Sequence, residues 1–518
     1  MQYSEETKIR LEKIKRMKDA WIIPYAAKFD KKNNIADIVL MSQNDFRDIN
    51  DIIKDPKKEI STAWRIVLYR SFWKISFAKL QDSTWEIQIM FSRENCSIDT
   101  WSEVKTEITE EMTAFKFMEK LVDVWDYIWI SWELFITHKW ELTIFAKEFK
   151  FLSKAIRPLP EKFHWIQDQE ALYRQRYLDM IMNKETYDRF LFKSAFYRTL
   201  REFYTKEWFV ELQTPILWNS ASWAAAAPFI THHNDFDIDV YLRIAFETSL
   251  KKATVWRFEK VFEIWQDFRN EWSDPSHLQE FTQVEHYAAF WDYKDNMVFA
   301  EKLFDYIFDT LNISRKLKVK DKEWNIKEVD FTTPWARIDY VEQIKKDSWI
   351  DVSKYSRDDT ERLLKDIKDA WIKFDWMDKM FAPTLVDYLY KKVTRPKILW
   401  PAFIYNYPST MQPLARISDA DNNIVEQFQL LVNWWEICKA YSELVDPVTQ
   451  QDNFNKQAQA SQLWDEEATQ WDDDFVLAME YWMPPQSWFW MWLERILAIL
   501  TEQDNLRDVV LFPLTRPM

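Results

Sequence analysis

The sequence predicts an α+β fold in which a large domain, built on a mostly antiparallel sheet, follows a small all-β barrel. Two patterns support this fold class. Between residues 56 and 155, short runs of alternating apolar residues recur at nearly regular spacing, which is typical of a barrel. After residue 170, helical stretches and strand-like runs mix without strict alternation, which favours an antiparallel sheet over a parallel, doubly wound one.

The chain of 518 residues is long enough for two or three domains, one of them large. The stretch around Pro158 and Pro160 has no clear period and is typical of a linker. A five-stranded barrel of this size suits the oligonucleotide-binding (OB) fold, although another small β-domain fits the pattern equally well. We expect a helical extension, the barrel, a linker and the large domain at residues 1–55, 56–155, 156–170 and 171–518.

Composition excludes several classes of protein. The formal net charge of −15 argues against a protein that coats nucleic acid nonspecifically, but it leaves a specific RNA partner open. No apolar run approaches the roughly 18 residues that cross a membrane, and the charged N-terminal segment lacks the apolar core of a signal peptide. Cys96 and Cys438 lie too far apart in the sequence for a disulfide framework or a zinc knuckle. We therefore expect a cytoplasmic protein.

The most unusual feature of the composition is that the chain has no glycine and 31 tryptophans. Ordinary usage of about 7% predicts roughly 36 glycines in a chain of this length. Trp140 lies between two apolar runs, at a hairpin-turn position that favours glycine. We hypothesise that most of these tryptophans are glycine in the native protein, because a UGA codon read as glycine by the organism gives tryptophan in the standard translation. The alternative is a truly glycine-free, tryptophan-rich protein.

A candidate site begins where a strand-like run ends at residues 268–271, Phe-Arg-Asn-Glu. An arginine beside a carboxylate at a strand end can hold a phosphate bidentately while the carboxylate binds an amine. Alone, this spacing is typical of a surface ion pair. More polar and aromatic residues follow, which favours a binding site: His277, Phe281, Glu285, Tyr287, Glu494 and Arg495.

These segments resemble the class II aminoacyl-tRNA synthetases. Residues 268–271 with 277–287 are similar to motif 2 of that class, and residues 487–495 are similar to motif 3. Residues 209–215 resemble motif 1, the dimerisation element. The resemblance implies an antiparallel-sheet catalytic domain of the class II type at 171–518, preceded by an OB-fold anticodon-binding domain, in a homodimer.

Within this class, the chain resembles the lysine enzymes nearly from end to end. The resemblance implies ATP-dependent activation of L-lysine to lysyl-adenylate and transfer to tRNA(Lys), with release of AMP and pyrophosphate, Mg²⁺ as cofactor, and no membrane or DNA partner. The segments that carry it are residues 152–164, 176–183, 228–234, 241–245 and 442–447. Tryptophans that fall where the family has glycine agree with the recoding hypothesis: Trp21, Trp223, Trp272, Trp482, Trp488, Trp490 and Trp492.

The resemblance also assigns the ATP site. Arg269 grips the α-phosphate and stabilises the charge that develops there, so that Arg269 and Arg495 are the expected catalytic residues. Glu271 accepts a hydrogen bond from the adenine amino group, while Phe281 stacks under the ring and Arg495 covers its other face. His277 reaches the γ-phosphate.

Specificity for lysine requires buried negative charge opposite the ε-ammonium, and by resemblance Glu247, Glu443 and the Tyr287 hydroxyl supply it. Glu285 is expected to hold the α-amino group. A site built for an ammonium rejects analogues that lack one, because its carboxylates are then left unpaired. The same resemblance adds four residues to the lysine site: Trp223, Arg269, Tyr441 and Trp490.

Four positions depart from the family pattern: Gln429, Lys439, Leu278 in place of an asparagine beside His277, and Ala227 in place of an arginine. Glu436 is the best placed magnesium ligand, since Mg²⁺ prefers oxygen donors, but Gln429 stands where the family usually has a second, acidic ligand. Lys439 stands where an asparagine commonly contacts lysine. These departures leave open a noncatalytic tRNA-binding relative of the synthetases. A sister synthetase for aspartate or asparagine is the other alternative, although an aspartate site needs an arginine where Glu247 and Glu443 offer negative charge.

The barrel is expected to bind the tRNA anticodon. By resemblance, Phe77 stacks on an anticodon base and Gln88 forms a hydrogen bond to one. Stacking combined with hydrogen bonds to base edges is the usual way in which proteins recognise unpaired RNA. Considered alone, Phe77 is equally typical of a barrel core.

Overall fold

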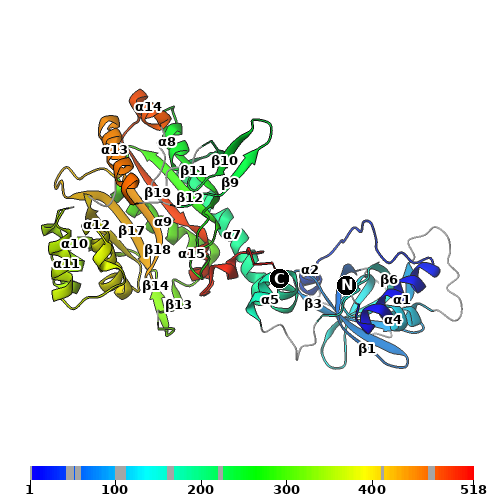
Figure 1. Ribbon diagram of the computed structural model, residues 1–518. Helices are drawn as coiled ribbons and strands as arrows, with labels where there is room; N and C mark the ends of the chain where they lie inside the picture. The colour runs from blue at the N-terminus through cyan, green and yellow to red at the C-terminus, as the bar shows by residue number, and fades with distance from the viewer. Residues whose placement is uncertain are drawn as a thin grey trace. The chain divides into compact units, whose positions relative to one another are not determined.

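The computed structural model of the chain is shown in Figure 1. The structure describes residues 3–41, 52, 60–99, 113–159, 168–219, 226–321, 323–356, 358–409, 414–464 and 473–517. The chain divides into two compact units, Met1–Ile166 and Gln167–Met518, and each has a hydrophobic core of its own. The sheets are mostly antiparallel and are combined with helices, so the predicted α+β class is confirmed.

The first unit is built on a six-stranded sheet with the order β3-β2-β1-β5-β6-β4, in which β3 also pairs with β6. The β3–β6 pairing is parallel and brings an outer strand of the sheet back against an inner one. The elements are α1 (Glu5–Asp19), α2 (Ile35–Met41), β1 (Ile60–Ser71), β2 (Ile75–Gln81), β3 (Glu86–Ser92), β4 (Ser97–Asp99), α4 (Ala114–Leu121), β5 (Tyr127–Ile136) and β6 (Leu142–Ser153).

The second unit contains an eight-stranded sheet with the order β15-β16-β17-β18-β19-β12-β11-β7. The pairs at its two edges, β15–β16 and β11–β7, are parallel, and the pairs between them are antiparallel. Its strands are β7 (Val210–Glu211), β11 (Lys260–Phe268), β12 (Glu280–Ala289), β15 (Ala336–Asp339), β16 (Ala402–Pro408), β17 (Ile424–Val432), β18 (Trp435–Ser442) and β19 (Gln486–Trp492).

Helices and two smaller sheets surround this sheet. The helices are α5 (Gln169–Arg174), α6 (Arg176–Met182), α7 (Lys184–Lys206), α8 (Glu247–Thr254), α9 (Tyr293–Leu311), α10 (Tyr340–Ser348), α11 (Thr360–Asp369), α12 (Ala382–Val393), α13 (Pro447–Trp464), α14 (Asp473–Trp482) and α15 (Leu493–Leu500), with short 3₁₀ turns η2 (Val352–Lys354), η3 (Met377–Lys379), η4 (Arg395–Lys397) and η6 (Leu506–Val509). The small sheets comprise β8 (Leu217–Trp218), β9 (Ile230–His233) and β10 (Ile238–Leu242), and β13 (Lys316–Lys320) with β14 (Ile326–Asp330).

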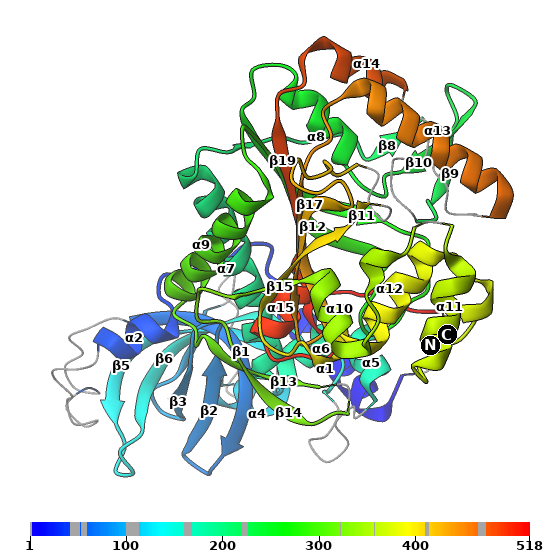
Figure 2. The same ribbon diagram turned by 90° about the vertical axis from the view of Figure 1, so that its left-hand side faces the viewer.

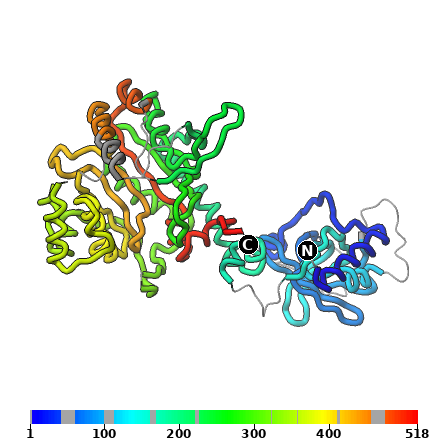
Figure 3. Tube along the Cα trace, viewed as in Figure 1, coloured from blue at the N-terminus to red at the C-terminus, as the bar shows by residue number. Residues whose placement is uncertain are grey.

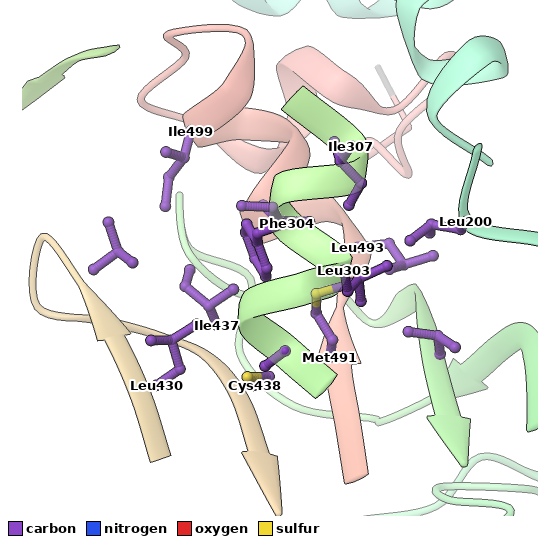
Figure 4. Packing of buried hydrophobic residues seen from close by; sticks show 14 of the residues in the cluster. Leu200, Leu303, Phe304, Ile307, Leu430, Ile437, Cys438, Met491, Leu493 and Ile499 are labelled. Carbon is purple, nitrogen blue, oxygen red and sulfur yellow. The ribbon is translucent and has the colours of Figure 1, made fainter. Parts of the chain in front are cut away.

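One face of the large sheet is covered by α9, which packs together with α7 (Figure 2). Side chains along a strand point alternately to opposite faces, so every second residue of the central strands enters this core. Figure 4 shows the packing of α9 against the strands in residues Leu303, Phe304, Ile307, Leu430, Ile437, Cys438 and Met491. The alternate residues of the same strands point to the other face.

The C-terminal segment lies against the first helices of the second unit (Figure 3). The buried Arg176 donates to the backbone oxygen of Arg507 at 2.8 Å and pairs with Asp179 at 2.8 Å. Tyr173 donates to Asp508 at 3.2 Å. These bonds tie the end of the chain to α5 and α6.

Tryptophan is concentrated at left-handed backbone positions. It accounts for 31 of 518 residues in the chain, but for eleven of the eighteen described non-glycine residues that have positive φ. They are Trp21, Trp125, Trp132, Trp140, Trp208, Trp324, Trp349, Trp371, Trp376, Trp434 and Trp482. A side chain with a Cβ is strained in this region, which glycine enters without cost.

Three helix ends illustrate the pattern. After α1, the amide of Trp21 donates to the Lys18 oxygen at 3.0 Å and that of Ile22 to the Met17 oxygen at 2.9 Å. The same pair of bonds follows α7 at Trp208 and α11 at Trp371. This is the Schellman motif, whose left-handed residue is usually glycine.

Among the helices of the described residues, none is both long and apolar enough to cross a membrane.

Candidate active site

Three strands in the middle of the large sheet bring the predicted site residues to the face that α9 does not cover. This face is called the open face below. On β12, Val284 and Ala288 enter the core with α9, so Phe281, Glu285 and Tyr287 point the other way. On β19, Trp488 and Trp490 lie directly opposite Tyr287 and Glu285, and Trp492 lies opposite Gln283. On β18, Lys439 and Tyr441 face Trp490 and Trp488.

A bulge in β18 adds Glu436 to this face. The register of β17 and β18 shifts between Leu430 and Leu431, and the two consecutive residues Ile437 and Cys438 both enter the core. An extra residue in one strand reverses the alternation beyond it. Glu436 and Lys439 therefore both point to the open face, and the Glu436 carboxylate is the largest electrostatic partner of the Lys439 amine.

Helix α8 lies over this face and supplies two charged side chains. Glu247 and Lys251 are four residues apart, so they occupy the same side of the helix. The Lys251 ammonium is fully buried, at 2.6 Å from Glu247 and 2.9 Å from Glu443, which follows β18. Tyr441 donates to the same Glu247 oxygen at 2.5 Å. These four residues form a buried cluster.

One oxygen of Glu443 remains available within this cluster. Glu443 is 4% exposed, and its Oε1 atom has no hydrogen-bond partner, while Oε2 pairs with Lys251. Burial raises the pKa of Glu443 to about 8, although the Lys251 ammonium opposes the shift. A buried acceptor without a partner is costly unless a ligand satisfies it, and a cationic donor satisfies a carboxylate best.

The third carboxylate, Glu285, lies on β12 beside Tyr287. It accepts hydrogen bonds from the Tyr287 hydroxyl at 2.8 Å and from the Gln283 amide at 3.2 Å. Burial raises its pKa well above the ordinary value, and the negative charge of Glu247 adds to the shift. Three carboxyl groups thus converge on one region with the ammonium of Lys251 among them, so this region has more acidic than basic groups.

The other end of the open face carries the predicted phosphate-binding groups. Arg269 follows the last residue of β11; its backbone amide donates to the Gln279 oxygen at 2.8 Å, and its guanidinium lies 5.1 Å from the Phe281 ring centre. Glu271 is exposed two residues later. Arg495 Nη2 lies 3.3 Å from His277 Nε2. The site residues predicted from motifs 2 and 3 are therefore brought together.

The indole of Trp492 occupies the space between Phe281 and Arg495. The rings of Trp492 and Phe281 stack with centroids 4.8 Å apart and an interplanar angle of 30°. The Arg495 guanidinium lies over the Trp492 ring, 3.6 Å from its centre. Trp490 stacks on Trp492 in turn, at 5.8 Å. A flat aromatic group between an aromatic ring and a guanidinium is the arrangement predicted for adenine, and here a side chain of the protein adopts it.

Comparisons with known proteins agree with this geometry. The family of class II tRNA synthetases (D, K and N) matches residues 168–516. The lysine–tRNA ligase of Thermosipho africanus is 35% identical over 509 residues, covering 98% of this chain and 95% of the relative. That of Carboxydothermus hydrogenoformans is 34% identical over 99% of this chain and 98% of its own length.

The chain belongs to the lysine–tRNA ligase family of class II tRNA synthetases. A third member, from Aquifex aeolicus, is 38% identical over 465 residues, which cover 89% of this chain and 74% of the relative. The matches to the two nearly full-length members also span the first unit, so the family relationship covers both units.

Several predicted residues of this ligase chain lie elsewhere. Trp223 falls outside the described residues. Phe77 and Gln88 belong to the first unit, on the same face of adjacent strands, because Gln88 pairs with Lys79, two residues from Phe77. Phe77 is half-buried with its edge toward the exposed Phe72, and the Gln88 amide donates to Thr143 at 2.9 Å.

The predicted magnesium ligands offer a limited donor set. Within the described ranges, no three His, Cys, Asp or Glu side chains are grouped to hold a metal ion. Glu436 offers a carboxylate, and the Gln429 amide oxygen accepts from the Tyr407 hydroxyl at 2.8 Å. Mg²⁺ commonly binds through one or two carboxylates and substrate phosphates. These residues therefore fit a magnesium ion that is shared with ATP, and not one that the protein encloses alone.

Two residues at the site were not predicted from the sequence. Lys251 follows Glu247 at the spacing of one helical turn, and that spacing was a usable signal. Arg243 is fully buried beneath the end of β11, where it pairs with Glu263 at 2.8 Å and with Asp267 at 3.2 Å. It supports the strand end that carries Arg269, and nothing local in the sequence indicates these pairs.

Proposed function

We infer that this ligase activates L-lysine with ATP to form lysyl-adenylate and then transfers the lysyl group to tRNA(Lys), with release of AMP and pyrophosphate. Membership of the lysine–tRNA ligase family supports the reaction. The single structural observation that supports lysine as the substrate is the buried Glu443 oxygen that has no partner, in a cluster of three carboxylates.

We propose that the ε-ammonium of lysine binds Glu443, Glu247 and the Tyr287 hydroxyl, and that Glu285 binds the α-ammonium. Tyr441 already donates to Glu247, which orients that carboxylate. Position 490, which lies opposite Glu285, is proposed to border the substrate. Aspartate and asparagine fit less well, because Lys251 is already paired with two carboxylates and the other charged groups of the cluster are acidic.

The activation step requires no protein nucleophile. A carboxylate oxygen of lysine attacks the α-phosphorus of ATP, the bond to the β-phosphate oxygen breaks, and pyrophosphate leaves. We propose that Arg269 binds the lysine carboxylate and the α-phosphate, so that it stabilises the charge that develops in the transition state. His277 holds the γ-phosphate, Arg495 covers the face of the adenine ring opposite Phe281, and Glu271 binds the adenine amino group. Positioning and electrostatic stabilisation account for catalysis.

Mg²⁺ is proposed to bind Glu436 together with the phosphates of ATP. When bound, it neutralises phosphate charge and so assists departure of pyrophosphate. Gln429 takes part through its amide oxygen only, since it carries no charge. Lys439 adds a positive group beside Glu436 on the same face.

We propose that the first unit is an OB-fold anticodon-binding domain. The β3–β6 pairing supports a closed barrel, because it joins an outer strand of the sheet to an inner one. Phe77 and Gln88 share one face there, where a base can stack and accept a hydrogen bond. We further propose a cytoplasmic homodimer assembled through residues 209–215.

Amino-acid-dependent exchange of pyrophosphate into ATP tests the substrate. The enzyme purified from its source organism is assayed with lysine, aspartate and asparagine in turn. Lysine alone is expected to support exchange. Exchange with aspartate or asparagine instead would identify a sister synthetase, and no exchange with any amino acid would identify a noncatalytic relative.

We also propose that most of the tryptophans are glycine in the native protein. Their concentration at positive φ supports this, as do the three Schellman motifs. Trp492 supports it independently, because without its side chain the space between Phe281 and Arg495 is open to adenine. Mass spectrometry of the native protein provides the test: a peptide ending at Arg495 with the mass of tryptophan at positions 488, 490 and 492 refutes the recoding.

A further inference from the structure

Lys251 occupies the centre of the proposed lysine pocket, although it belongs to the protein. Its ammonium lies 2.6 Å from Glu247 Oε1 and 2.9 Å from Glu443 Oε2. Its side chain is 1% exposed. The ammonium thus links α8 to the residue that follows β18, and it takes one oxygen of each of the two carboxylates proposed to bind the substrate ε-ammonium.

The groups around Lys251 come from every element packed against it. Tyr287 on β12, Tyr441 on β18 and Phe475 on α14 face the ammonium with ring centres at 5.9, 5.7 and 5.5 Å. The acidic groups are Glu247 and Glu443, with Glu285 close to Glu247. A second amine on this face, that of Lys439, interacts with Glu436 more strongly than with Glu247. Lys251 is therefore the cation that belongs to the three-carboxylate cluster.

The charges of the cluster match the substrate only when Lys251 is included. Glu443 and Glu285 must lose their protons to bind ammonium groups, so in the complex with lysine the three carboxylates carry three negative charges, of which the Lys251 ammonium compensates one. Lysine brings two ammonium groups, one at each end. An uncompensated charge destabilises a buried site. Without Lys251, three carboxylates would face only two ammonium groups of lysine, and one negative charge would remain uncompensated.

We propose that Lys251 is a positioning residue for the ε-ammonium of lysine, which holds Glu247 and Glu443 apart and leaves Glu443 Oε1 as the acceptor for the substrate. The proposal rests on the proposed function of the same pocket. Lys251 does not touch the reacting atoms; it acts through the two carboxylates that bind the substrate.

The neighbouring Lys252 provides a matched control. It lies on the same helix and pairs with Asp474 at 2.7 Å, but that partner is 78% exposed. Lys252→Gln therefore removes the same charge from α8 without changing the pocket. Surface pairs contribute little, so wild-type kinetics are expected for this variant.

Lys251→Gln keeps most of the side-chain volume and removes the charge. We expect the KM for lysine in pyrophosphate exchange to rise on the order of 100-fold, because removing one partner leaves a buried charge uncompensated. The kcat at saturating lysine and the KM for ATP are expected to stay at wild-type values, since the defect lies in binding of the amino acid. All variants are expressed with the residues that mass spectrometry finds at the tryptophan positions.

The pH dependence separates positioning from a merely structural role. Glu443, with its pKa at about 8, must lose its proton to bind an ammonium, so the wild-type KM for lysine falls as pH rises toward 8 and then levels off. Without the Lys251 charge the pKa of Glu443 rises further. In Lys251→Gln the break in the pH profile, which is the pH at which the KM for lysine levels off, therefore moves to higher pH. Lys251→Arg keeps the charge but displaces the carboxylates, so its break stays near 8 while its KM for lysine rises about tenfold.

Each outcome has a defined meaning. Absence of lysine-dependent exchange in the unaltered enzyme overturns the proposed function. A normal unaltered enzyme, together with an unchanged KM for lysine and an unchanged pH break in Lys251→Gln, overturns the inference on Lys251 alone. If Lys251→Gln does not bind ATP and is therefore unfolded, Lys251→Arg decides, and a wild-type KM for lysine in that variant overturns the proposal.

Discussion

The two ends of the open sheet face differ in how completely they are prepared for a ligand. At the lysine end, Glu247, Glu443 and Lys251 hold one another in place, and the buried Oε1 atom of Glu443 has no hydrogen-bond partner. At the nucleotide end, Phe281 and Arg495 are in contact with the indole of Trp492, which occupies the space between them. One end presents an acceptor, and the other is filled by the protein itself.

The difference shows what each end requires of its residues. The lysine end is built on charged side chains from a helix and from strands, and Trp488 and Trp490 lie opposite Tyr287 and Glu285 there. At the nucleotide end, adenine is proposed to bind between Phe281 and Arg495, so the side chain at position 492 would compete with it. The proposed glycine at position 492 would therefore matter most at the nucleotide end, where the indole lies between Phe281 and Arg495.

The largest effect is expected from Arg269→Ala, which removes a charge from the nucleotide end. The rate of lysine-dependent pyrophosphate exchange should fall about 10²–10³-fold, because the guanidinium acts on charge that develops in the transition state. Arg257→Ala is the matched control, since Arg257 is exposed and precedes the other end of β11. Near-normal exchange by Arg269→Ala would contradict its assigned role.

Trp492→Gly tests whether the filled space is the adenine site. In the chain with tryptophan at position 492, the change should lower the KM for ATP about 10–100-fold, because one stacked base contributes about 1–3 kcal/mol. The KM for lysine should change much less, since the carboxylate cluster is untouched. The comparison between the two ends is wrong if ATP binds equally well with the indole present.

A smaller effect is expected outside both ends, at Phe77. Phe77→Ala should raise the KM for tRNA about tenfold through loss of one stacked base. Exchange in the absence of tRNA is measured in the same variant as the internal control and should remain normal. If exchange falls as much as aminoacylation does, the first unit does more than bind the anticodon.

The smallest effect is the pH dependence of the lysine end in the unaltered enzyme. Because the raised pKa of Glu443 keeps it protonated below about pH 8, the KM for lysine should fall about threefold between pH 7.5 and 8.5. The KM for ATP should not follow the same curve. If the KM for lysine and the KM for ATP depend on pH in the same way, titration of Glu443 does not act on lysine binding alone.

The α+β class and the family could be predicted from the sequence, together with a candidate site whose residues the structure brings close together. The two-residue period of β12 places Phe281, Glu285 and Tyr287 on one face, and Arg269 and Arg495 lie in motifs of fixed spacing. The absence of glycine was also evident from composition alone. These patterns are local or periodic, so they can be recognised in the sequence without knowledge of the tertiary contacts.

Only the tertiary structure decided which groups meet across the face. The bulge that turns Glu436 toward the site depends on how β17 and β18 pair. The contact of Lys251 with Glu443 joins residues 192 positions apart, and the indole of Trp492 meets Phe281 only because β19 lies beside β12. Such contacts depend on long-range packing, which no local period or propensity encodes.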